Sequence, residues 1–409
     1  MSRAGRMTDR PIDSPQRAIE AAGERVLPTP VESRALLEAI GLVLASDVCI
    51  DRPSPPFDVS AMDGYAVATR SIRAGRVRVA GEARIGADPG RLDDGTAAIR
   101  VATGAGIPLG ADAVIRREDV IEGAGDAIEL PQQAIDACRP GLAIRRRGEN
   151  AAAGVPLGVA GREIAAHVVA ALASVGAATV QVHRPVRAAI LVTGDELVGH
   201  DVAPGPWQIR DSNGPALLAM LSRRRWLNPS PPRRIHDDLD EATRAARELI
   251  EAHDCLLLTG GVSMGHRDFV PELVSRLGAE LICHRLPQRP GKPLLLASLR
   301  GKLIAGLPGN PQSVMVTSRR IVVPLLGRMA GLALPAGAAR PMVLDSSRER
   351  ISLWWHRPVV ETGFGHVRLV EGKGSGDVIA AGRSDGFVEL KPEQTVETPT
   401  QVPLYAWEW

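Results

Sequence analysis

The chain has 409 residues, 44% of them apolar and 23% charged, and its 49 Lys and Arg against 47 Asp and Glu leave a formal net charge of +2. This mixture is typical of a globular protein of several domains, and so small a net charge argues against a nucleic-acid-binding protein. No apolar run approaches the roughly 20 residues of a membrane span, and four scattered cysteines predict neither a zinc site nor a disulfide framework. We therefore expect a cytoplasmic protein with no membrane segment.

The first part of the chain combines helical and extended patterns. Residues before Ser14 have the composition of a disordered start. The segment 32–44 has helical apolar spacing, and an Ala-rich stretch at 163–175 also predicts a helix. Between them, residues 67–130 contain short Val, Ile and Ala runs separated by Gly, Pro and Asp, which predict a small β-rich domain.

From residue 186 the pattern changes to alternating strands and helices. Buried strands are predicted by VRAAILVTG, CLLLTGG and KLIAGLPG. Helices are predicted by DSNGPALLAMLSRRR, DEATRAARELIEAHD, FVPELVSRLG and PQSVMVTSRRIVVPLLG. This alternation predicts a doubly wound, mostly parallel sheet with helices on both faces. The tail from 342 to 409 has short alternating runs and predicts a small β domain without a helix.

Three glycine-containing loops follow these strands, where open α/β sheets bind their ligands. They are TGDEL, TGGVSMGHRD and GLPGNP. Glycine lets the backbone approach an anion closely, so the second loop is a candidate phosphate site. In the third loop, Asn310 is expected to cap the following helix, which begins at Pro311. A plain glycine-rich turn and a plain helix start are the alternatives for these two loops.

A basic turn and several carboxylates complete the predicted site. In RPGKP, Gly291 between two prolines is expected to hold Arg289 and Lys292 near each other, where both could bind an oxyanion. A solvated surface turn is the alternative. The sheet-edge loops carry carboxylates that, beside a phosphate, favour Mg²⁺. These carboxylates are Asp195, Glu196, Asp237, Asp238 and Asp268.

Together these motifs resemble the molybdopterin molybdenumtransferase family, which includes MoeA and the E-domain of gephyrin. The matching stretches are PPFDVSAMDGYAV, ATGAGIPLGADAVIRRED, TGDEL, IRDSNGPAL, DCLLLTGGVSMGHRDFV, RPGKP and GLPGNPQS, with GKGSG and SDGFVEL in the tail. The resemblance implies Mg²⁺-dependent insertion of molybdate into adenylylated molybdopterin, with release of AMP. It also implies a homodimer whose active site is shared between subunits. A molybdopterin adenylyltransferase and acceptor molybdoenzymes are candidate partners.

The resemblance also implies four domains. These are an N-terminal helical or linker domain (14–54 with 140–182), a small β-rich domain (55–139), the α/β molybdopterin-binding domain (183–330) and a C-terminal β domain (331–409).

Site residues follow from the matching motifs. The catalytic set that the resemblance implies is Asp63, Thr103, Glu196, Asp268 and Lys292, with Asp63 and Thr103 facing the partner's nucleotide site. The metal ligands would be Glu196, Asp237 and Asp268. Substrate binding would involve Gly260, Gly261, Ser263, Gly265, Pro308, Gly309 and Asn310, and the molybdate pocket Arg289, Lys292, Ser313, Arg357 and Ser375.

The chain departs from the family pattern at a few positions. The family usually has Asn at Val59, Asp at Asn150, Lys at Arg289 and an acidic residue at His266. These departures keep two alternatives open: a catalytically weak paralogue that acts as a molybdopterin-binding or scaffold protein, and a molybdopterin adenylyltransferase. An enzyme would bring Glu196, Asp268 and Lys292 into one pocket, which a scaffold would not need.

Overall fold

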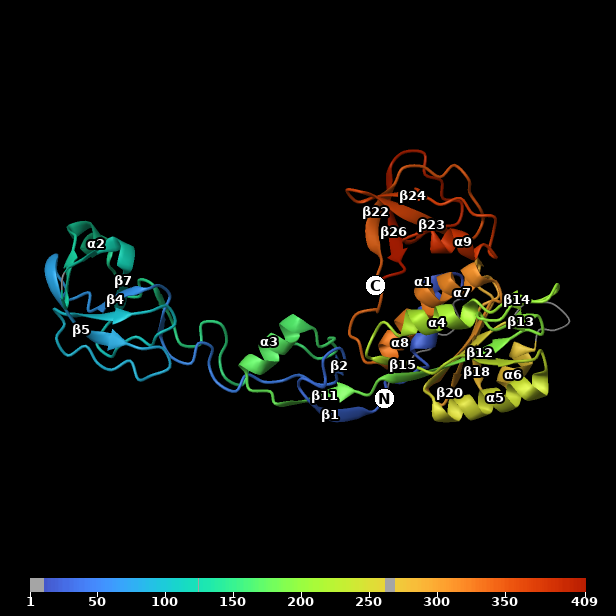
Figure 1. Ribbon diagram of the computed structural model, residues 1–409, viewed down its shortest axis with the longest axis horizontal. Helices are drawn as coiled ribbons and strands as arrows, with labels where there is room; N and C mark the ends of the chain where they lie inside the picture. Colours follow the sequence, from blue (N-terminus) through green and yellow to red (C-terminus); the bar gives the residue numbers. More distant parts are fainter. Residues whose placement is uncertain (1–10, 124, 262–268) are drawn as a thin grey trace, which may run out of the picture. The chain divides into compact units, whose positions relative to one another are not determined.

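The computed structural model describes residues 11–123, 125–261 and 269–409, and the chain divides into two compact units (Figure 1). The first unit comprises Met1–Ser46, Val159–Ala170 and Ala178–Trp409, and the second Asp47–Gly158 and Ala171–Ala177. Most of the predicted disordered start lies outside the described residues. None of the described helices is long and apolar enough to cross a membrane. The four-domain division stays a prediction.

A seven-stranded sheet forms the centre of the first unit. Its neighbours run β15-β12-β17-β21-β20-β18, and β16 also pairs with β12. The strands are β12 (Val186–Thr193), β15 (Leu227–Pro229), β16 (Arg233–Ile235), β17 (Cys255–Thr259), β18 (Glu280–His284), β20 (Leu295–Leu299) and β21 (Lys302–Leu307). The pairs around β12 and β17 are parallel, whereas β20 runs antiparallel to β21 and β18. The prediction of a mostly parallel sheet is confirmed.

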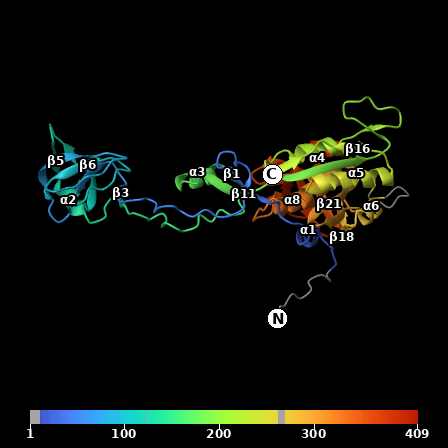
Figure 2. The same cartoon turned by 90° about the horizontal axis from the view of Figure 1, so that it is seen from below.

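Helices cover both faces of this sheet, as the doubly wound pattern predicts. Alternate residues of β12 enter different cores, because successive strand side chains point to opposite faces: Ile190 packs in one core and Leu191 in the other. One face is covered by α1 (Pro15–Gly23), α4 (Asn213–Leu221), α7 (Pro311–Thr317) and α8 (Val323–Met329). The other is covered by α5 (Leu239–Ala252) and α6 (Val270–Arg276), which lie side by side (Figure 2).

The helix predicted at PQSVMVTSRRIVVPLLG is continuous but changes its winding. Between α7 and α8 lies a π-helical segment, η2 (Ser318–Val322). Pro324 lacks the N–H that would bond to the carbonyl of Arg320 in a regular α-helix, so the proline accounts for the local change. Arg319 and Arg320 in this segment are buried, although they stand in an apolar run.

The tail forms a closed five-stranded barrel, which confirms the predicted C-terminal β domain. Its strands are β22 (Arg340–Leu344), β23 (Trp354–Gly363), β24 (His366–Leu369), β25 (Gly386–Leu390) and β26 (Thr400–Ala406). Strand β23 pairs with both β24 and β25, which closes the barrel. The short strand β19 (Gln288–Arg289) adds to β23 in parallel.

The expectation that the tail has no helix was wrong. Helix α9 spans Val378–Gly382, and the Asp377 side chain accepts a hydrogen bond from the Ala380 N–H at its start. A five-residue helix is too short to show a helical apolar period, but the aspartate cap is a signal that the sequence contains.

The helix predicted at 32–44 was also wrong. Residues Val31–Ala35 form β1, which pairs antiparallel with β11 (Thr179–His183), and β11 also pairs with β2 (Val43–Leu44). Leu37 and Ile40, two positions of the expected apolar face, are exposed. Pairing with β11, a segment more than 140 residues away, outweighs the local helical spacing. The helix predicted at 163–175 is confirmed as α3 (Ala166–Ser174).

The second unit contains the β-rich domain that the sequence predicts. Its sheet has the order β7-β4-β6-β5-β9-β8 and is accompanied by the short helix α2 (Gln132–Ala137). The strands are β4 (Gly64–Val67), β5 (Gly75–Ala83), β6 (Ala98–Val101), β7 (Ala113–Arg116), β8 (Ile121–Glu122) and β9 (Ala127–Leu130). Tyr65 is buried in the core of this sheet, and its hydroxyl donates to Glu122 (2.7 Å).

Candidate active site

The predicted substrate loops begin at one edge of the central sheet. Thr193 of β12 lies opposite Ile235 of β16, and Val192 lies opposite Thr259 of β17. Thr259 in turn lies opposite Leu307 of β21. The four strands therefore end together, and the loops that follow them start side by side, as expected for a parallel sheet.

Close backbone contact explains the glycines in two of these loops. A Cβ on Gly260 would lie 2.6 Å from both the carbonyl oxygen and the hydroxyl of Thr193, and its φ of +93° disfavours other residues. A Cβ on Gly309 would lie 3.9 Å from the Gly260 Cα, so the loops after β17 and β21 approach each other. Gly261 also has a positive φ, and Pro308 is buried beside Gly309. Predicted loop residues Ser263, Gly265, His266 and Asp268 lie outside the described residues.

The carboxylates at this edge differ in what holds them. Asp195 accepts a hydrogen bond from the Asp237 backbone N–H (3.1 Å), and Asp238 caps α5 by accepting from the Glu241 N–H. No hydrogen bond or ion pair with a described residue engages the carboxylates of Glu196 and Asp237. Within the described ranges, no group of three His, Cys, Asp or Glu side chains could together hold a metal ion.

The RPGKP turn is fixed by close packing. A Cβ on Gly291 would lie 2.7 Å from the Gln288 side-chain nitrogen and 2.8 Å from a methyl carbon of Thr317 on α7, and its φ is +95°. The Gln288 amide also donates to the Gly291 carbonyl (3.1 Å). The turn exposes Arg289 and Lys292, and neither side chain forms an ion pair or hydrogen bond with a described residue.

Arg357 is brought next to Arg289 by the β19–β23 pairing, in which Arg289 lies opposite Trp355. The Arg357 guanidinium stacks on the Trp355 ring, 4.3 Å from its centroid, and donates to the Ser347 hydroxyl (3.0 Å). Burial lowers the pKa of Arg357, and the positive charge of Arg289 lowers it further, against the opposing effect of Glu349. The two arginines therefore repel each other, and an anion between them would relieve this repulsion.

The loop after β21 is tied to the barrel. The Asn310 amide donates to the Ser375 hydroxyl (2.7 Å), so the expectation that its side chain caps α7 was wrong, although Asn310 does occupy the N-cap position. Ser313 is buried in the first turn of α7, one turn before Thr317, which packs against Gly291. Helix α7 thus links Ser375 with the RPGKP turn.

Asp63 and Thr103 lie together in the second unit. Asp63 Oδ1 accepts hydrogen bonds from the Thr103 backbone N–H (2.7 Å) and hydroxyl (2.8 Å), which lower the pKa of the Asp63 carboxyl. Asp63 borders a cavity of about 230 Å³ whose lining includes Tyr65, Arg100, Arg117 and Glu122. The predicted place of Asp63 and Thr103 at a partner's nucleotide site stays a prediction.

Two of the departures from the family pattern have local partners. Val59 lies in β3 (Val59–Ser60), opposite Arg145 of β10 (Ile144–Arg145). Asn150 accepts from the Arg145 guanidinium (2.6 Å) and donates to the Ser54 hydroxyl (3.1 Å). A neutral amide therefore satisfies two partners at this position.

One polar residue near the loops received no predicted role. Asn213 begins α4 and donates its amide to the Gly309 carbonyl (2.8 Å), which connects α4 to the loop after β21. Asn213 lies in the matching motif IRDSNGPAL and in a predicted helix, but nothing in the sequence indicates that its side chain reaches Gly309.

Comparisons with known proteins agree across most of the chain. Residues 13–176 match the model of the MoeA N-terminal region (domains I and II), and residues 189–328 match that of a probable molybdopterin binding domain. A molybdopterin molybdenumtransferase of Staphylococcus epidermidis is 30% identical over 81% of this chain and 79% of its own. One from Synechococcus elongatus is 34% identical over 73% and 76%.

A solved structure extends the agreement to the whole fold. The molybdopterin biosynthesis MoeA protein of Pyrococcus horikosii superposes with a TM-score of 0.78 and 26% identity, over 98% of this chain and 100% of its own.

Proposed function

Since the chain belongs to the molybdopterin molybdenumtransferase family, whose enzymes serve molybdenum cofactor biosynthesis, we propose that it inserts molybdate into adenylylated molybdopterin, releases AMP and requires Mg²⁺. The observation that carries this proposal is the pair Arg289 and Arg357. The positive charge of Arg289 lowers the pKa of Arg357, which the β19–β23 pairing places nearby, and Arg289 has no carboxylate partner among the described residues. Such a pair suits a tetrahedral dianion such as molybdate.

Each side chain of the molybdate pocket has a distinct task. Arg289 and Arg357 offer planar forks of N–H donors, and Lys292 offers a mobile point charge on the same turn. Ser313 and Ser375 would add hydroxyl groups. Ser313 lies in the first turn of α7, which follows Asn310, and Ser375 accepts the hydrogen bond from the Asn310 amide. The rigid Gly291 turn supports this assignment, because it limits the freedom that Arg289 and Lys292 would lose on binding the anion.

The residues at the sheet edge fit a magnesium ion that shares its ligands with the substrate. Mg²⁺ is bound by one or two protein carboxylates together with substrate phosphates and water. Glu196 and Asp237 supply two carboxylates that no described residue engages, on loops that start side by side. When bound, the ion would neutralise charge on the pyrophosphate. Gly260 and Gly309 would let the backbone approach the same phosphates.

We further propose a homodimer in which Asp63 and Thr103 complete a site of the partner subunit. The support is their chemistry: Thr103 holds the Asp63 carboxyl in its ionised form and in a fixed orientation at the border of a polar cavity. Mixing Asp63→Ala subunits with Lys292→Ala subunits should then restore part of the activity. Light scattering that shows a monomer, or no restoration after verified subunit exchange, would argue against the shared site.

Release of AMP tests the proposed reaction directly. Purified protein, adenylylated molybdopterin and molybdate should release AMP when Mg²⁺ is present, and Glu196→Ala should abolish most of this release. Glu251→Ala is the matched control, because Glu251 is an exposed carboxylate in the last turn of α5, away from the sheet-edge loops. No AMP release by the wild-type protein would refute the reaction, and equal rates for both variants would refute the metal site.

A further inference from the structure

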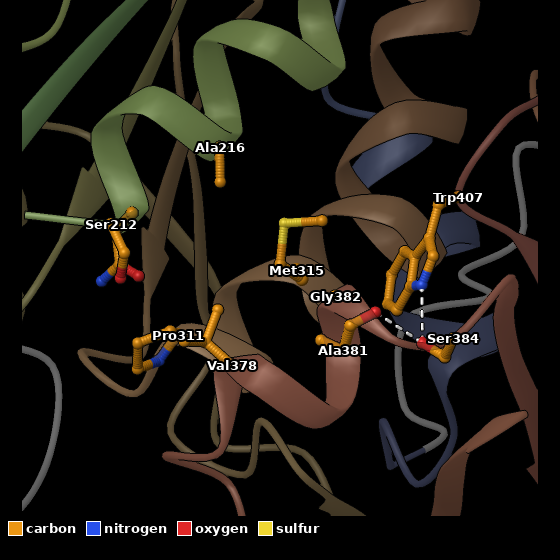
Figure 3. A pocket seen from close by; sticks show the side chains of 10 residues that line it. Ser212, Ala216, Pro311, Met315, Val378, Ala381, Gly382, Ser384 and Trp407 are labelled. Atoms are coloured by element: carbon orange, nitrogen blue, oxygen red, sulfur yellow. Dashed lines mark hydrogen bonds between the residues drawn. The ribbon is translucent and has the colours of Figure 1, made fainter. Parts of the chain in front are cut away.

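A cavity of about 300 Å³ separates helices α4 and α7 of the sheet from the barrel and its helix α9 (Figure 3). Ala216 and Met315 line it on the side of the sheet, and Val378 and Trp407 line it on the side of the barrel. All of these elements belong to the first unit. Close-packed side chains normally hold neighbouring elements in place. Because the cavity interrupts that packing, contacts elsewhere carry more of the task of fixing the barrel.

The π-helical segment η2 provides such contacts. The Arg319 Nε donates to the Ala406 carbonyl at the end of β26 (2.6 Å), and its Nη1 donates to the Gly337 carbonyl (2.8 Å) in the segment that connects α8 to the barrel. The neighbouring Arg320 donates to Glu389 of β25. One short helical segment therefore bonds to two strands of the barrel and to the segment that leads into it.

Arg319 is a buried cation whose presence stability alone does not explain. It is 1% exposed and, unlike Arg320, forms no ion pair with a described residue. Burial lowers the pKa of Arg319 to about 10, so the side chain still carries its charge at neutral pH. A well-packed apolar side chain can stabilise a buried position as well as a charged one does. What the guanidinium adds is a pair of directed hydrogen bonds to two fixed carbonyls, which define one orientation of the barrel.

The two parts of the protein that Arg319 connects both contribute to the proposed molybdate pocket. Segment η2 continues directly from α7, which carries Ser313 in its first turn. The barrel carries Arg357 on β23 and Ser375 just before α9. A shift of the barrel against α7 would change the distances between these three side chains. A displacement of about 1 Å is enough to impair a binding site of this kind.

We propose that Arg319 is a positioning residue of the molybdate pocket. Through Ala406 and Gly337 it holds the barrel where Arg357 and Ser375 can bind the same anion as Ser313. Arg319 is too deeply buried to contact the anion itself, and two of its donors already bond to the carbonyls. The inference rests on the proposed function, because molybdate is the ligand there.

Arg319→Met tests the proposal, since it removes the charge and both hydrogen bonds but keeps a long side chain. Molybdate binding, measured by calorimetric titration of the AMP complex, should weaken about tenfold or more, the effect of losing one hydrogen bond to a charged group. AMP binding without molybdate should stay unchanged, because the sheet-edge loops lie outside the barrel. A purely structural role would lower the stability of the variant and leave the affinity of the folded protein for molybdate unchanged.

Arg225→Met is the matched control. Arg225 also donates to a backbone carbonyl, that of Ile40 (2.7 Å), but Ile40 is not part of the barrel. This variant should bind molybdate as the wild type does. Equal losses of molybdate affinity in Arg225→Met and Arg319→Met would overturn the proposal.

Arg319→Lys covers the case that Arg319→Met does not fold. It keeps the charge but can donate to the two carbonyls only with a smaller, differently shaped group, so its molybdate affinity should fall severalfold while its AMP affinity stays unchanged. Wild-type molybdate affinity in Arg319→Lys, or in a folded Arg319→Met, would overturn the proposal.

Amide hydrogen exchange separates this inference from the proposed reaction. Without ligand, Arg319→Met should exchange faster than the wild type in β26 and around Gly337, and at the same rate in β17 of the central sheet. If the wild type releases AMP but exchange and molybdate affinity are unchanged in Arg319→Met, the proposed function stands and the inference fails. If exchange rises as expected but the wild type neither binds molybdate nor releases AMP, Arg319 fixes the barrel for another purpose, and both the pocket and the reaction are refuted.

Discussion

Arg320 and Arg289 both lie near strand β23, but of the two only Arg320 pairs with a carboxylate of the described residues. Arg320 donates two hydrogen bonds to Glu389 (2.7 and 3.2 Å), and Glu389 also contacts the His356 ring nitrogen (3.0 Å). The Arg320 and Glu389 side chains are each only 7% exposed. Arg289, in contrast, is exposed, faces the like charge of Arg357 and is paired with no described carboxylate.

The difference separates a structural cluster, formed by Arg320, Glu389 and His356, from a binding cluster, formed by Arg289, Lys292 and Arg357. Burying a charge is costly unless a partner compensates for the lost solvation, and the Glu389 carboxylate compensates Arg320 within the protein. Among the described residues Arg289 has no such partner and would take its counter-charge from an outside anion, whereas Arg357 lies 3.8 Å from the Glu349 carboxylate. Both clusters contain an arginine near other polar side chains, so their positions alone do not distinguish them. The presence or absence of a carboxylate partner identifies the cluster that can still bind an anion.

The largest expected effect comes from breaking the structural cluster. Glu389→Ala leaves Arg320 buried without a counter-charge, and we expect it to lower the free energy of unfolding by about 3–5 kcal/mol. Urea unfolding followed by circular dichroism measures this loss. The exposed pair Arg233–Glu248 provides the control, since Glu248→Ala should cost no more than about 1 kcal/mol.

A double variant shows whether the loss reflects the unpaired charge. Replacing both Arg320 and Glu389 with leucine removes the ion pair without leaving either charge buried, and it should recover most of the stability that Glu389→Ala loses. If the double variant is as unstable as Glu389→Ala, the loss of stability does not come from the unpaired charge of Arg320.

Acid should weaken the same cluster. Burial alone would raise the pKa of Glu389, but the hydrogen bonds and charges of His356 and Arg320 lower it to about 2. The unfolded chain has a glutamate pKa of about 4.3, so the stabilisation is complete above that value and is lost as the pH falls from there through about 2. Unfolding measured between these values should depend less on pH in Glu389→Gln. Equal pH dependence in the two proteins would contradict the assignment.

A substitution in the binding cluster should change the affinity for molybdate. Lys292→Ala should weaken molybdate binding by about 1.5–3 kcal/mol, the range for a hydrogen bond to a charged group, or roughly one to two decades in affinity. Calorimetric titration of the AMP complex with molybdate measures it. Lys391→Ala, which removes an exposed lysine of the barrel, is the control and should bind as the wild type does. If Lys292→Ala also binds normally, RPGKP is only a turn.

The contrast also shows what the sequence can predict. Apolar strand runs and glycine loops at their ends predicted the parallel sheet and the edge where the loops meet, because both depend on local patterning and on the geometry of parallel strands. Arg289 and Lys292 could be paired from the sequence because a four-residue turn connects them. The proximity of Arg289 to Arg357 depends on the β19–β23 pairing between segments 66 residues apart, for which no local signal exists.

The errors have the same physical origin. The segment 32–44 has a helical period, but it forms strands because β11 supplies paired backbone groups. Arg319 and Arg320 interrupt an apolar run, and the sequence does not indicate that distant hydrogen-bond acceptors meet them in the fold. Glu389 accepts from Arg320, and the Ala406 carbonyl accepts from Arg319. The cavity joins Asn213 to Trp407, almost 200 residues later, so its shape is a property of tertiary packing alone.

The smallest expected effect is a difference in the free energy of unfolding between Arg289→Gln and the wild type, and its sign should reverse when molybdate is added. Without ligand, Arg289→Gln relieves the repulsion of Arg357 and should raise the free energy of unfolding by roughly 0.2–1 kcal/mol at low salt, the size of an exposed charge interaction. Molybdate at about 100 times its Kd stabilises the wild type by about 2.7 kcal/mol and the weaker-binding variant by less, so the wild type should then be the more stable protein. Thermal unfolding with and without molybdate measures both states, and added salt should shrink the difference seen without ligand.

Arg289→Lys, which keeps the charge, should follow the wild type in both states and bind molybdate within about a decade of it. If Arg289→Gln is less stable than the wild type even without molybdate, Arg289 serves the fold, and the distinction between the two arginine clusters fails.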